Sequence, residues 1–562
     1  MRRLTWLVFM IGPCLTAWGE EPSLREAKVI SDLLDMGGCV TRDDSLPGCP
    51  VVSVDLSGTG AIDGDLKGLQ HLPHLRALSL ALTCITGEGL NEIKDIVTLT
   101  SLDLSFTLIS DAGLRHLRQL TGLRHLDLSS TGITDAGLAE IRQLKGLREL
   151  CLSRTNITNA GLRELKDLGN LEVLDLGDIL HVSDSGLTDV KEIKGLKKLN
   201  MADGWFSGSG FKELKDLKEL EDLDVGHTHV TDAGLLEIKS LSRLRRLGLH
   251  FTYFTINGLR ELKTLKNLRD LDLGNNSVTD AGLRELRTLK GLERLDLSAS
   301  WITDSGLREL KDLPNLKVLN LSSTQISDAG LKELADIRTL EEIGLNRVRI
   351  AGAGLAYLQS LQGLRTLDLG DVSMTDEGMM NLGRLSQLAT LKMCFSRIPE
   401  RGFDSATGLR HLKAIDLTYS NVTDASLEAI GKLEGLESLV LKYTQITDAG
   451  LKHLKGLNNL RELDLQVTKV TDAGLAELKE LKSLERLLLC GPGITDTGIQ
   501  QLTGLKRLRL LRVVNAGTPL TQAGFKAMRA ALPDCQIVIP RVLHSEAAPT
   551  QEPTATEVGR RD

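Results

Sequence analysis

Four side chains that can bind a metal or transfer a proton lie close together in the sequence: Asp224, His227, His229 and His250. Imidazole is a common ligand of transition metals, and it can act as a general acid or base near neutral pH. The spacing matches no zinc-site or metalloprotease motif. The sequence also has no Gly-x-Ser-x-Gly nucleophile motif and no phosphate-binding loop. We therefore interpret these residues as polar loop and surface groups, and we predict no metal, no cofactor and no enzymatic activity.

A second set of carboxylates recurs in the pattern Leu-Asp-Leu, and it includes Asp224, Asp272 and Asp296. If these segments are adjacent strands, their middle residues lie side by side on one face of a sheet, where like charges repel. The neighbouring column carries basic groups at Lys198, Arg246 and Arg294. Two interpretations of this column stay open. Solvated aspartates at the strand edge are a common feature of such repeats without a binding role, or the column is a surface for a basic or cationic partner.

Aromatic residues make up only 3% of the chain, yet several are clustered between 205 and 301. Trp205, Tyr253 and Trp301 follow each other at 48-residue steps, and His229 lies between the first two. Phe211 replaces a helix leucine and is expected in the core. Trp and Tyr are favoured anchors in interfaces, although the rings can also fill gaps left by irregular loops. The predicted partner-binding residues are Trp205, Phe206, His227, His229, His250, Phe251, Tyr253, Phe254 and Trp301, with Asp224, Asp272 and Asp296.

A 24-residue repeat determines where these side chains lie. Residues 102–114 read Leu-Asp-Leu-Ser-Phe-Thr-Leu-Ile-Ser-Asp-Ala-Gly-Leu, and 126–138 read Leu-Asp-Leu-Ser-Ser-Thr-Gly-Ile-Thr-Asp-Ala-Gly-Leu. The pattern continues for about 20 repeats, with longer steps only from Thr158 to Ser183 and from Thr495 to Thr521. A period of this length with Leu-x-x-Leu-x-Leu is the signature of leucine-rich repeats.

Each repeat predicts one strand and one short helix. Leu126-Asp127-Leu128 alternates apolar and polar residues, as a strand with one buried face does. Leu138, Ile141 and Leu144 have helical spacing, and Thr134 or Asp135 can cap that helix. One repeat cannot bury its leucines alone, so repeats must stack. The expected fold class is an α/β solenoid, a horseshoe or superhelical arc, with parallel strands on the concave face and short helices on the convex face.

The two ends of the chain depart from the repeat. Residues 1–19 combine Arg2 and Arg3, an apolar stretch too short to span a bilayer, and the cleavage pattern Ala17-Trp18-Gly19, which together predict a signal peptide. We expect a secreted, periplasmic or cell-surface protein, and no membrane span in the mature chain. An uncleaved anchor, or a lipoprotein modified at Cys14, are the alternatives.

The predicted domains are a signal peptide (1–19), a capping helix and loop (20–50), the solenoid (51–540) and a disordered tail (541–562). Residues 24–37 are expected to form the capping helix, which ends at Gly37-Gly38. Cys39 and Cys49 flank a short loop before the first strand, so we predict a disulfide between them.

The composition excludes some classes of function. Of the 562 residues, 41% are hydrophobic and 25% are charged, and the formal net charge is −7. A general nucleic-acid binder needs a basic surface to neutralise phosphates, so we predict no nucleic-acid partner. We expect the partner of this chain to be a protein, and we expect the chain itself to be a monomer.

The repeat Leu-Asp-Leu-Ser-x-Thr-x-Ile-Thr-Asp-Ala-Gly-Leu-x-Glu-Leu resembles that of secreted leucine-rich-repeat proteins of planctomycete bacteria. Their N-terminal helix, Gly-Gly turn and Val-Val-x-Val-Asp-Leu-Ser strand are also similar, so the resemblance covers residues 24–540. It implies a binding scaffold and supplies no catalytic residues. We therefore predict an exported, non-enzymatic protein–protein interaction scaffold that binds through its concave face.

The repeats also resemble those of F-box substrate receptors, which share the Ile-Thr-Asp-x-Gly-Leu element. This resemblance implies an alternative function, the substrate-recognition subunit of a ubiquitin-ligase-like or effector system. The sequence lacks the recurrent Cys of those repeats, and residues 20–50 leave no room for an F-box.

Overall fold

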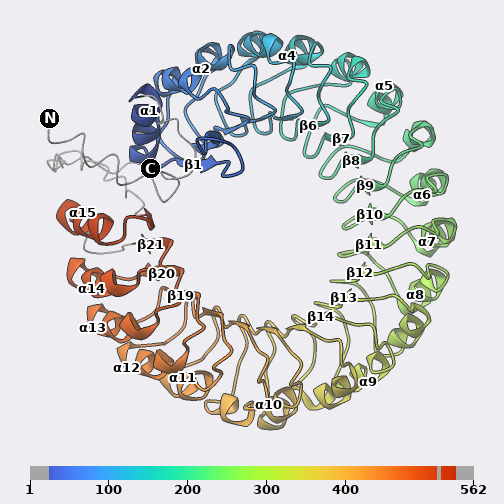
Figure 1. Ribbon diagram of the computed structural model, residues 1–562. Helices are drawn as coiled ribbons and strands as arrows, with labels where there is room; N and C mark the ends of the chain where they lie inside the picture. Colours follow the sequence, from blue (N-terminus) through green and yellow to red (C-terminus); the bar gives the residue numbers. More distant parts are fainter. Residues whose placement is uncertain (1–23, 515–520, 539–562) are drawn as a thin grey trace, which may run out of the picture. The chain divides into compact units, whose positions relative to one another are not determined.

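The computed structural model describes residues 24–514 and 521–538. The chain divides into two compact units, the first ending at Val348 and the second beginning at Arg349. In each unit the strands line the inner side of the curve and the helices its outer side (Figure 1). The predicted signal peptide (1–19) and tail (541–562) lie outside the described residues.

The first unit contains α-helices, 3₁₀ helices (η) and strands. Its helices are α1 (Leu24–Asp35), η2 (Asp63–His71), α2 (Gly87–Ile93), α3 (Asp111–Leu114), η3 (Arg115–Gln119), α4 (Asp135–Ile141), η4 (Gly161–Asp167), η5 (Asp184–Gly186), α5 (Leu187–Val190), η6 (Phe211–Asp216), α6 (Asp232–Ile238), α7 (Ile256–Glu261), η7 (Leu262–Thr264), α8 (Asp280–Leu286), η8 (Gly306–Asp312) and α9 (Leu331–Leu334). Its strands are β1 (Cys39–Arg42), β2 (Val51–Asp55), β3 (Ala77–Ser79), β4 (Ser101–Asp103), β5 (His125–Asp127), β6 (Glu149–Cys151), β7 (Val173–Asp175), β8 (Lys198–Asn200), β9 (Asp222–Asp224), β10 (Arg246–Gly248), β11 (Asp270–Asp272), β12 (Arg294–Asp296), β13 (Val318–Asn320) and β14 (Glu342–Gly344).

The second unit has the same alternation. Its helices are η9 (Ala353–Ser360), α10 (Asp376–Gly383), η10 (Gly402–Ser405), α11 (Asp424–Ile430), α12 (Asp448–Leu451), η11 (Lys452–Gly456), α13 (Asp472–Leu475), η12 (Ala476–Glu480), α14 (Asp496–Gln500), η13 (Gln501–Gly504) and α15 (Gln522–Ala531). Its strands are β15 (Thr366–Asp368), β16 (Thr390–Lys392), β17 (Ala414–Asp416), β18 (Ser438–Val440), β19 (Glu462–Gln466), β20 (Arg486–Cys490), β21 (Leu510–Val514) and β22 (Gln536–Val538).

Neighbouring strands pair in parallel and in repeat register. In the first unit Leu271 of β11 faces Leu295 of β12, and Leu319 of β13 comes next. The extra residue of one repeat does not disturb this register, because Val173 of β7 still pairs with Lys198 of β8. The predicted solenoid of parallel strands and short helices is therefore confirmed.

The core follows the predicted apolar positions. Leu126 and Leu128 of one repeat are 2% and 0% exposed. Leu138, Ile141 and Leu144 on the helical side of the same repeat are each 0% exposed. Burying a leucine side chain contributes about 1.5–3 kcal/mol, so each repeat is stabilised chiefly by the leucines it shares with its neighbours.

The Thr-Asp-Ala-Gly element links one repeat to the next. Thr134 caps its own helix by accepting from the Ala136 amide at 3.3 Å, as the sequence predicts. Asp111 of the preceding repeat in turn accepts from the Thr134 amide at 2.7 Å and from its hydroxyl at 2.7 Å. A Cβ on Gly137 would contact that same Asp111 carboxylate. The glycine is thus required because the carboxylate of the previous repeat occupies the space of a side chain.

The N-terminal cap differs from the prediction in one respect. Helix α1 buries Val29 and Leu33 as expected, but residues predicted as loop form β1, which pairs antiparallel with β2. Cys39 pairs with Asp55 at one end of this ladder, whereas Cys49 precedes its other end. Cys39 is a free thiol, so the predicted disulfide between Cys39 and Cys49 is wrong: the hairpin register holds the two cysteines apart.

Candidate binding surface

The turn that leaves each strand has the same unusual backbone in consecutive repeats. A residue just after the strand takes a positive φ, for example +53° at His227 and +51° at Phe251. This left-handed region is uncommon for residues other than glycine, and for bulky ones it is an outlier. We call this residue, together with the residue two positions after it, the turn ridge of each repeat. His227 and His229 are the turn-ridge residues of one repeat.

Three predicted residues of the turn ridge form a stack, which we call the rim ladder. The His229 ring lies between Trp205 and Tyr253, with both ring-centroid distances 5.6 Å and interplanar angles of 12° and 14°. The backbone aligns them, because the His229 and Tyr253 amides each donate to a carbonyl of the preceding repeat at 2.9 Å. Trp205 is 59% exposed and Tyr253 is 60% exposed. Large rings that stack on one another and still face solvent are available to a partner.

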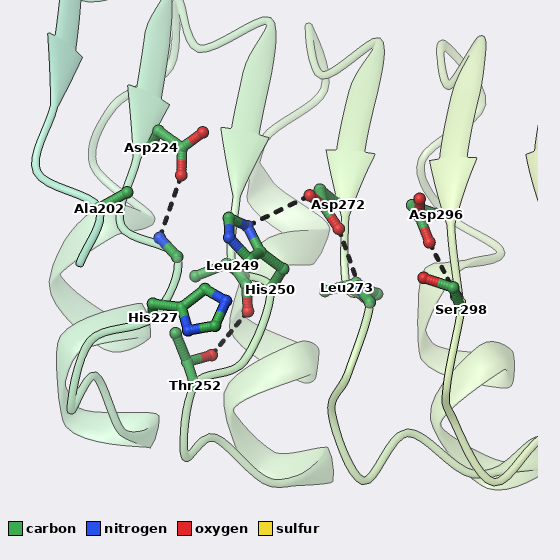
Figure 2. A network of polar contacts seen from close by, with 12 residues as sticks. Ala202, Asp224, His227, Leu249, His250, Thr252, Asp272, Leu273, Asp296 and Ser298 are labelled. Atoms are coloured by element: carbon green, nitrogen blue, oxygen red, sulfur yellow. Dashed lines mark hydrogen bonds and ion pairs between the residues drawn. The ribbon is translucent and has the colours of Figure 1, made fainter. Parts of the chain in front are cut away.

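A second cluster of rings lies beside the rim ladder. His227 stacks on Phe251 with centroids 4.7 Å apart, and it meets the edge of His250 at 4.9 Å. The His250 ring occupies space that Gly226 leaves open, since a Cβ there would overlap it. Figure 2 shows His250 between Asp224 and Asp272, with its Nδ1 3.3 Å from Asp272 Oδ2.

The charged groups near these rings are paired with one another. The hydrogen bond to Asp272 raises the pKa of His250, although burial opposes this. Burial alone would raise the pKa of Asp272, but the His250 and Gly274 hydrogen bonds lower it. Arg246 contacts Asp224 at 3.2 Å and so offsets its charge, whereas Arg294 lies 3.8 Å from Asp270. Among the described residues, Lys198 forms no ion pair.

The column of aspartates has a structural role that neither interpretation anticipated. Oδ1 of Asp224, Asp272 and Asp296 accepts from the amide two residues later, at 3.0, 3.0 and 2.8 Å. Figure 2 shows the carboxylates of Asp224, Asp272 and Asp296 turned toward these amides. The second oxygen of Asp296 accepts from Asn320 at 2.7 Å. These carboxylates hold the strand-exit turns through one oxygen each, and their role in binding a partner stays a prediction.

Two predicted binding residues belong to the core instead. Phe206 is 0% exposed and Phe254 is 7% exposed, so assigning them to the binding surface was wrong. Each directly follows a rim residue, and consecutive side chains in extended backbone point to opposite sides. Phe211 is buried as expected, at 1% exposed. The gap-filling interpretation therefore holds for these phenylalanines but not for Trp205 and Tyr253.

Trp301 occupies the predicted rim position but stands apart from the rim ladder. It is 61% exposed, and the intervening repeat carries Ser277, which provides no ring to continue the stack. The link between repeats is altered in the repeats of Trp205 and Tyr253 instead, because Gly208 and Ile256 stand where other repeats have the linking aspartate.

Sequence reasoning missed a third stack, in the second unit. Phe395, Tyr419 and Tyr443 occupy the positive-φ position of three successive repeats, and their rings stack with centroids 4.7 and 4.0 Å apart. The 24-residue spacing was the available signal.

The described part of the chain contains no group of three His, Cys, Asp or Glu residues that could hold a metal ion. Within the same residues no helix is long and apolar enough to cross a bilayer. The candidate site described above is a surface of stacked rings.

Comparison with known families supports this architecture. Residues 226–449 match the family described as leucine-rich repeat region, and shorter leucine-rich repeat matches cover 71–93, 97–117, 119–141 and 456–479. The chain is a leucine-rich-repeat protein. Among curated proteins, none matches the sequence significantly.

Solved structures with this fold include receptors and bacterial proteins. A TLR13–ssRNA13 complex aligns with a TM-score of 0.52 at 19% identity, over 84% of this chain and 78% of that one. An internalin (inlF) from Listeria monocytogenes aligns at 22% identity, with 66% and 95% coverage and a TM-score of 0.40. A leucine-rich-repeat protein of Leptospira interrogans aligns at 23% identity, with 79% and 97% coverage and a TM-score of 0.36. At these identities the likeness to this leucine-rich-repeat protein concerns the fold alone.

Proposed function

We propose that this leucine-rich-repeat protein is an exported, non-enzymatic scaffold that binds a protein partner through the turn ridge of its first unit. The observation that carries this proposal is the rim ladder, whose outer rings are 59% and 60% exposed. Aromatic side chains at the centre of an interface contribute a large share of binding energy. Because the rings are already stacked, their side chains lose little conformational freedom when a partner covers them.

The surroundings of the rim ladder favour a basic protein partner. Asp203 is exposed beside it, and the concave floor next to it carries Asp222, Asp224 and Asp270 around the single guanidinium of Arg246. A nucleic acid would meet this acidic surface unfavourably. The RNA in the TLR13 complex therefore does not suggest an RNA partner for this chain.

The rim ladder is tested with the variant Trp205→Ser, His229→Ser, Tyr253→Ser. Serine is native at the same position of another repeat, Ser277, so the fold should persist. We expect wild-type protein to capture a partner from a cell-surface or periplasmic extract. The variant should bind it on the order of tenfold more weakly or worse, as for loss of interface anchors.

Leu108→Ser is the matched control, since Leu108 has the same rim position and is 66% exposed. Leu108→Ser should leave capture of the partner unchanged. A separate Trp301→Ser variant measures what the isolated Trp301 ring contributes to capture. A correctly folded rim-ladder variant that retains every partner with wild-type affinity would contradict the proposal.

Export is a separate part of the proposal and rests on residues 1–19 alone. If a signal peptidase cleaves after Gly19, the mature chain begins at Glu20. N-terminal sequencing of protein recovered from the cell exterior or periplasm should give Glu20 first. Recovery of the chain with Met1 intact would exclude cleavage.

A further inference from the structure

Phe395, Tyr419 and Tyr443 of the second unit form a continuous exposed stack, which we call the Tyr ladder. The ring planes are nearly parallel, at 11° and 7°. The side chains are 57%, 46% and 36% exposed. The ladder crosses the ends of three neighbouring strands, β16, β17 and β18.

Neither the turn nor the core requires these rings. All three residues have φ of +58°, a region that bulky side chains rarely adopt. In other repeats the same position carries small or polar residues, such as Ser130, Asn275 and Ala299. Exposed rings in a disfavoured backbone conformation indicate a role in binding rather than in packing.

Four basic side chains lie in the repeats of the Tyr ladder and in the repeat that follows it: Lys392, Arg397, Lys442 and Lys469. Lys392 takes a strand position at which both neighbouring repeats carry aspartate, and Lys442 Nζ lies 5.4 Å from the Tyr443 ring centroid. Within the described residues none of these four cations forms an ion pair. They are therefore available to an anionic partner.

Carboxylates also lie near these cations, since Lys392 pairs in strand register with Asp368 on one side and Asp416 on the other. Asp416 Oδ1 already accepts from the Thr418 amide at 3.0 Å and from its hydroxyl at 2.6 Å. Asp464 is only 9% exposed, and its Oδ1 accepts from the Gln466 amide at 2.8 Å. A partner thus meets three exposed rings and four basic side chains without an ion pair among the described residues, while Asp416 and Asp464 are engaged by their own turns.

The stacking geometry limits what the rings can bind. Centroid spacings of 4.7 and 4.0 Å leave no room for a base or sugar ring between them, which would need about 7 Å. The ring faces cover one another, so the edges point outward, and an aromatic edge is positive. The Tyr419 and Tyr443 hydroxyls hydrogen-bond to each other, which raises the pKa of Tyr419. Ring edges and hydroxyls suit carbonyl and carboxylate oxygens.

We propose that the Tyr ladder and its four basic neighbours form a second binding site, for an extended acidic peptide segment of a protein. Carboxylates would pair with Lys392 and Lys442, while backbone carbonyls meet the ring edges and hydroxyls. The site lies wholly in the second unit and does not depend on the function proposed for the rim ladder.

The test uses the full mature chain and a fluorescently labelled peptide of alternating Glu and Ala, followed by fluorescence anisotropy. The variant Phe395→Ser, Tyr419→Ser, Tyr443→Ser removes the rings, and serine is native at this position at Ser130 and Ser323. A second variant, Lys392→Gln with Lys442→Gln, removes charge and keeps the rings. Each variant should weaken binding on the order of tenfold.

Phe106→Ser is the matched control, because Phe106 has the same positive-φ position and is 49% exposed in the first unit. It should leave the affinity unchanged. A peptide of alternating Gln and Ala should bind on the order of tenfold more weakly than the Glu peptide, and added salt should weaken the Glu peptide.

Three results would overturn the proposal. The Glu peptide fails to bind wild-type protein, or it binds both variants as well as wild type. In the third, single-stranded oligouridylate or a sulfated oligosaccharide binds through the Tyr ladder while the peptide does not. Circular dichroism shows whether the ring variant is folded. If it is not, the variant Lys392→Gln with Lys442→Gln still tests the proposal.

Discussion

Leu295→Ala is expected to lower the free energy of unfolding of the first unit by about 2–5 kcal/mol, the usual range for a buried leucine. Leu295 is 0% exposed at the centre of β12, and it packs in register with Leu271 and Leu319 on the adjacent strands. Truncation leaves a cavity that the two flanking repeats share. Because repeats contact only their neighbours, the loss should be concentrated around β11 to β13.

Hydrogen exchange followed by mass spectrometry measures this localisation, and urea unfolding measures the magnitude. Arg294→Ala is the control one residue away, since Arg294 is exposed and surface substitutions usually change stability by less than about 0.5 kcal/mol. Equal protease resistance of Leu295→Ala and wild type would show that Leu295 is not a core residue.

Asp184→Asn is expected to destabilise the first unit by about 1–3 kcal/mol at neutral pH, the cost of disrupting hydrogen bonds to a charged group. Asp184 Oδ2 accepts from the Ser207 amide and hydroxyl, both at 2.8 Å. Its Oδ1 accepts from the Gly208 and Gly210 amides at 3.1 and 2.9 Å. An Asn side chain has a single acceptor oxygen, so it turns an NH₂ group toward some of these donors.

The effect should depend on pH in a defined direction. Burial would raise the pKa of Asp184, but hydrogen bonds from Gly210, Ser207 and Gly208 outweigh it and lower the pKa. A lowered pKa in the folded state means that the ionised carboxylate contributes stability above its ordinary pKa. That contribution is lost as pH falls below about 4, so the variant and wild type should converge in acid.

Urea unfolding at neutral and at acidic pH measures the two differences. Asp95→Asn serves as the control, because Asp95 is exposed and makes no hydrogen bond through its carboxylate within the described residues. A destabilisation of Asp184→Asn that stays constant across this pH range would contradict the assigned role of the carboxylate.

The periodicity of the sequence determined most of the fold. The Leu-x-Leu strands, the leucines of the short helices and the α1 cap were all predictable, because each is specified by spacing within one repeat. Repetition adds a second constraint, since any face that is apolar in one repeat must meet the same face in the next. Trp205 and Tyr253 were predictable as exposed rim residues for the same reason, as they share one repeat position.

The tertiary structure alone decided two kinds of feature: contacts between repeats, and the side of the backbone to which each of two consecutive side chains points. Phe206 and Phe254 looked equivalent to their exposed neighbours, but extended backbone turns consecutive side chains to opposite sides. The bonds from Asp111 to Thr134 and from Asp184 to Ser207 join residues of different repeats, so a pattern within one repeat cannot reveal them. The 24-residue spacing of Phe395, Tyr419 and Tyr443 is visible in the sequence, but only the register of neighbouring strands brings their rings to centroid distances of 4.7 and 4.0 Å.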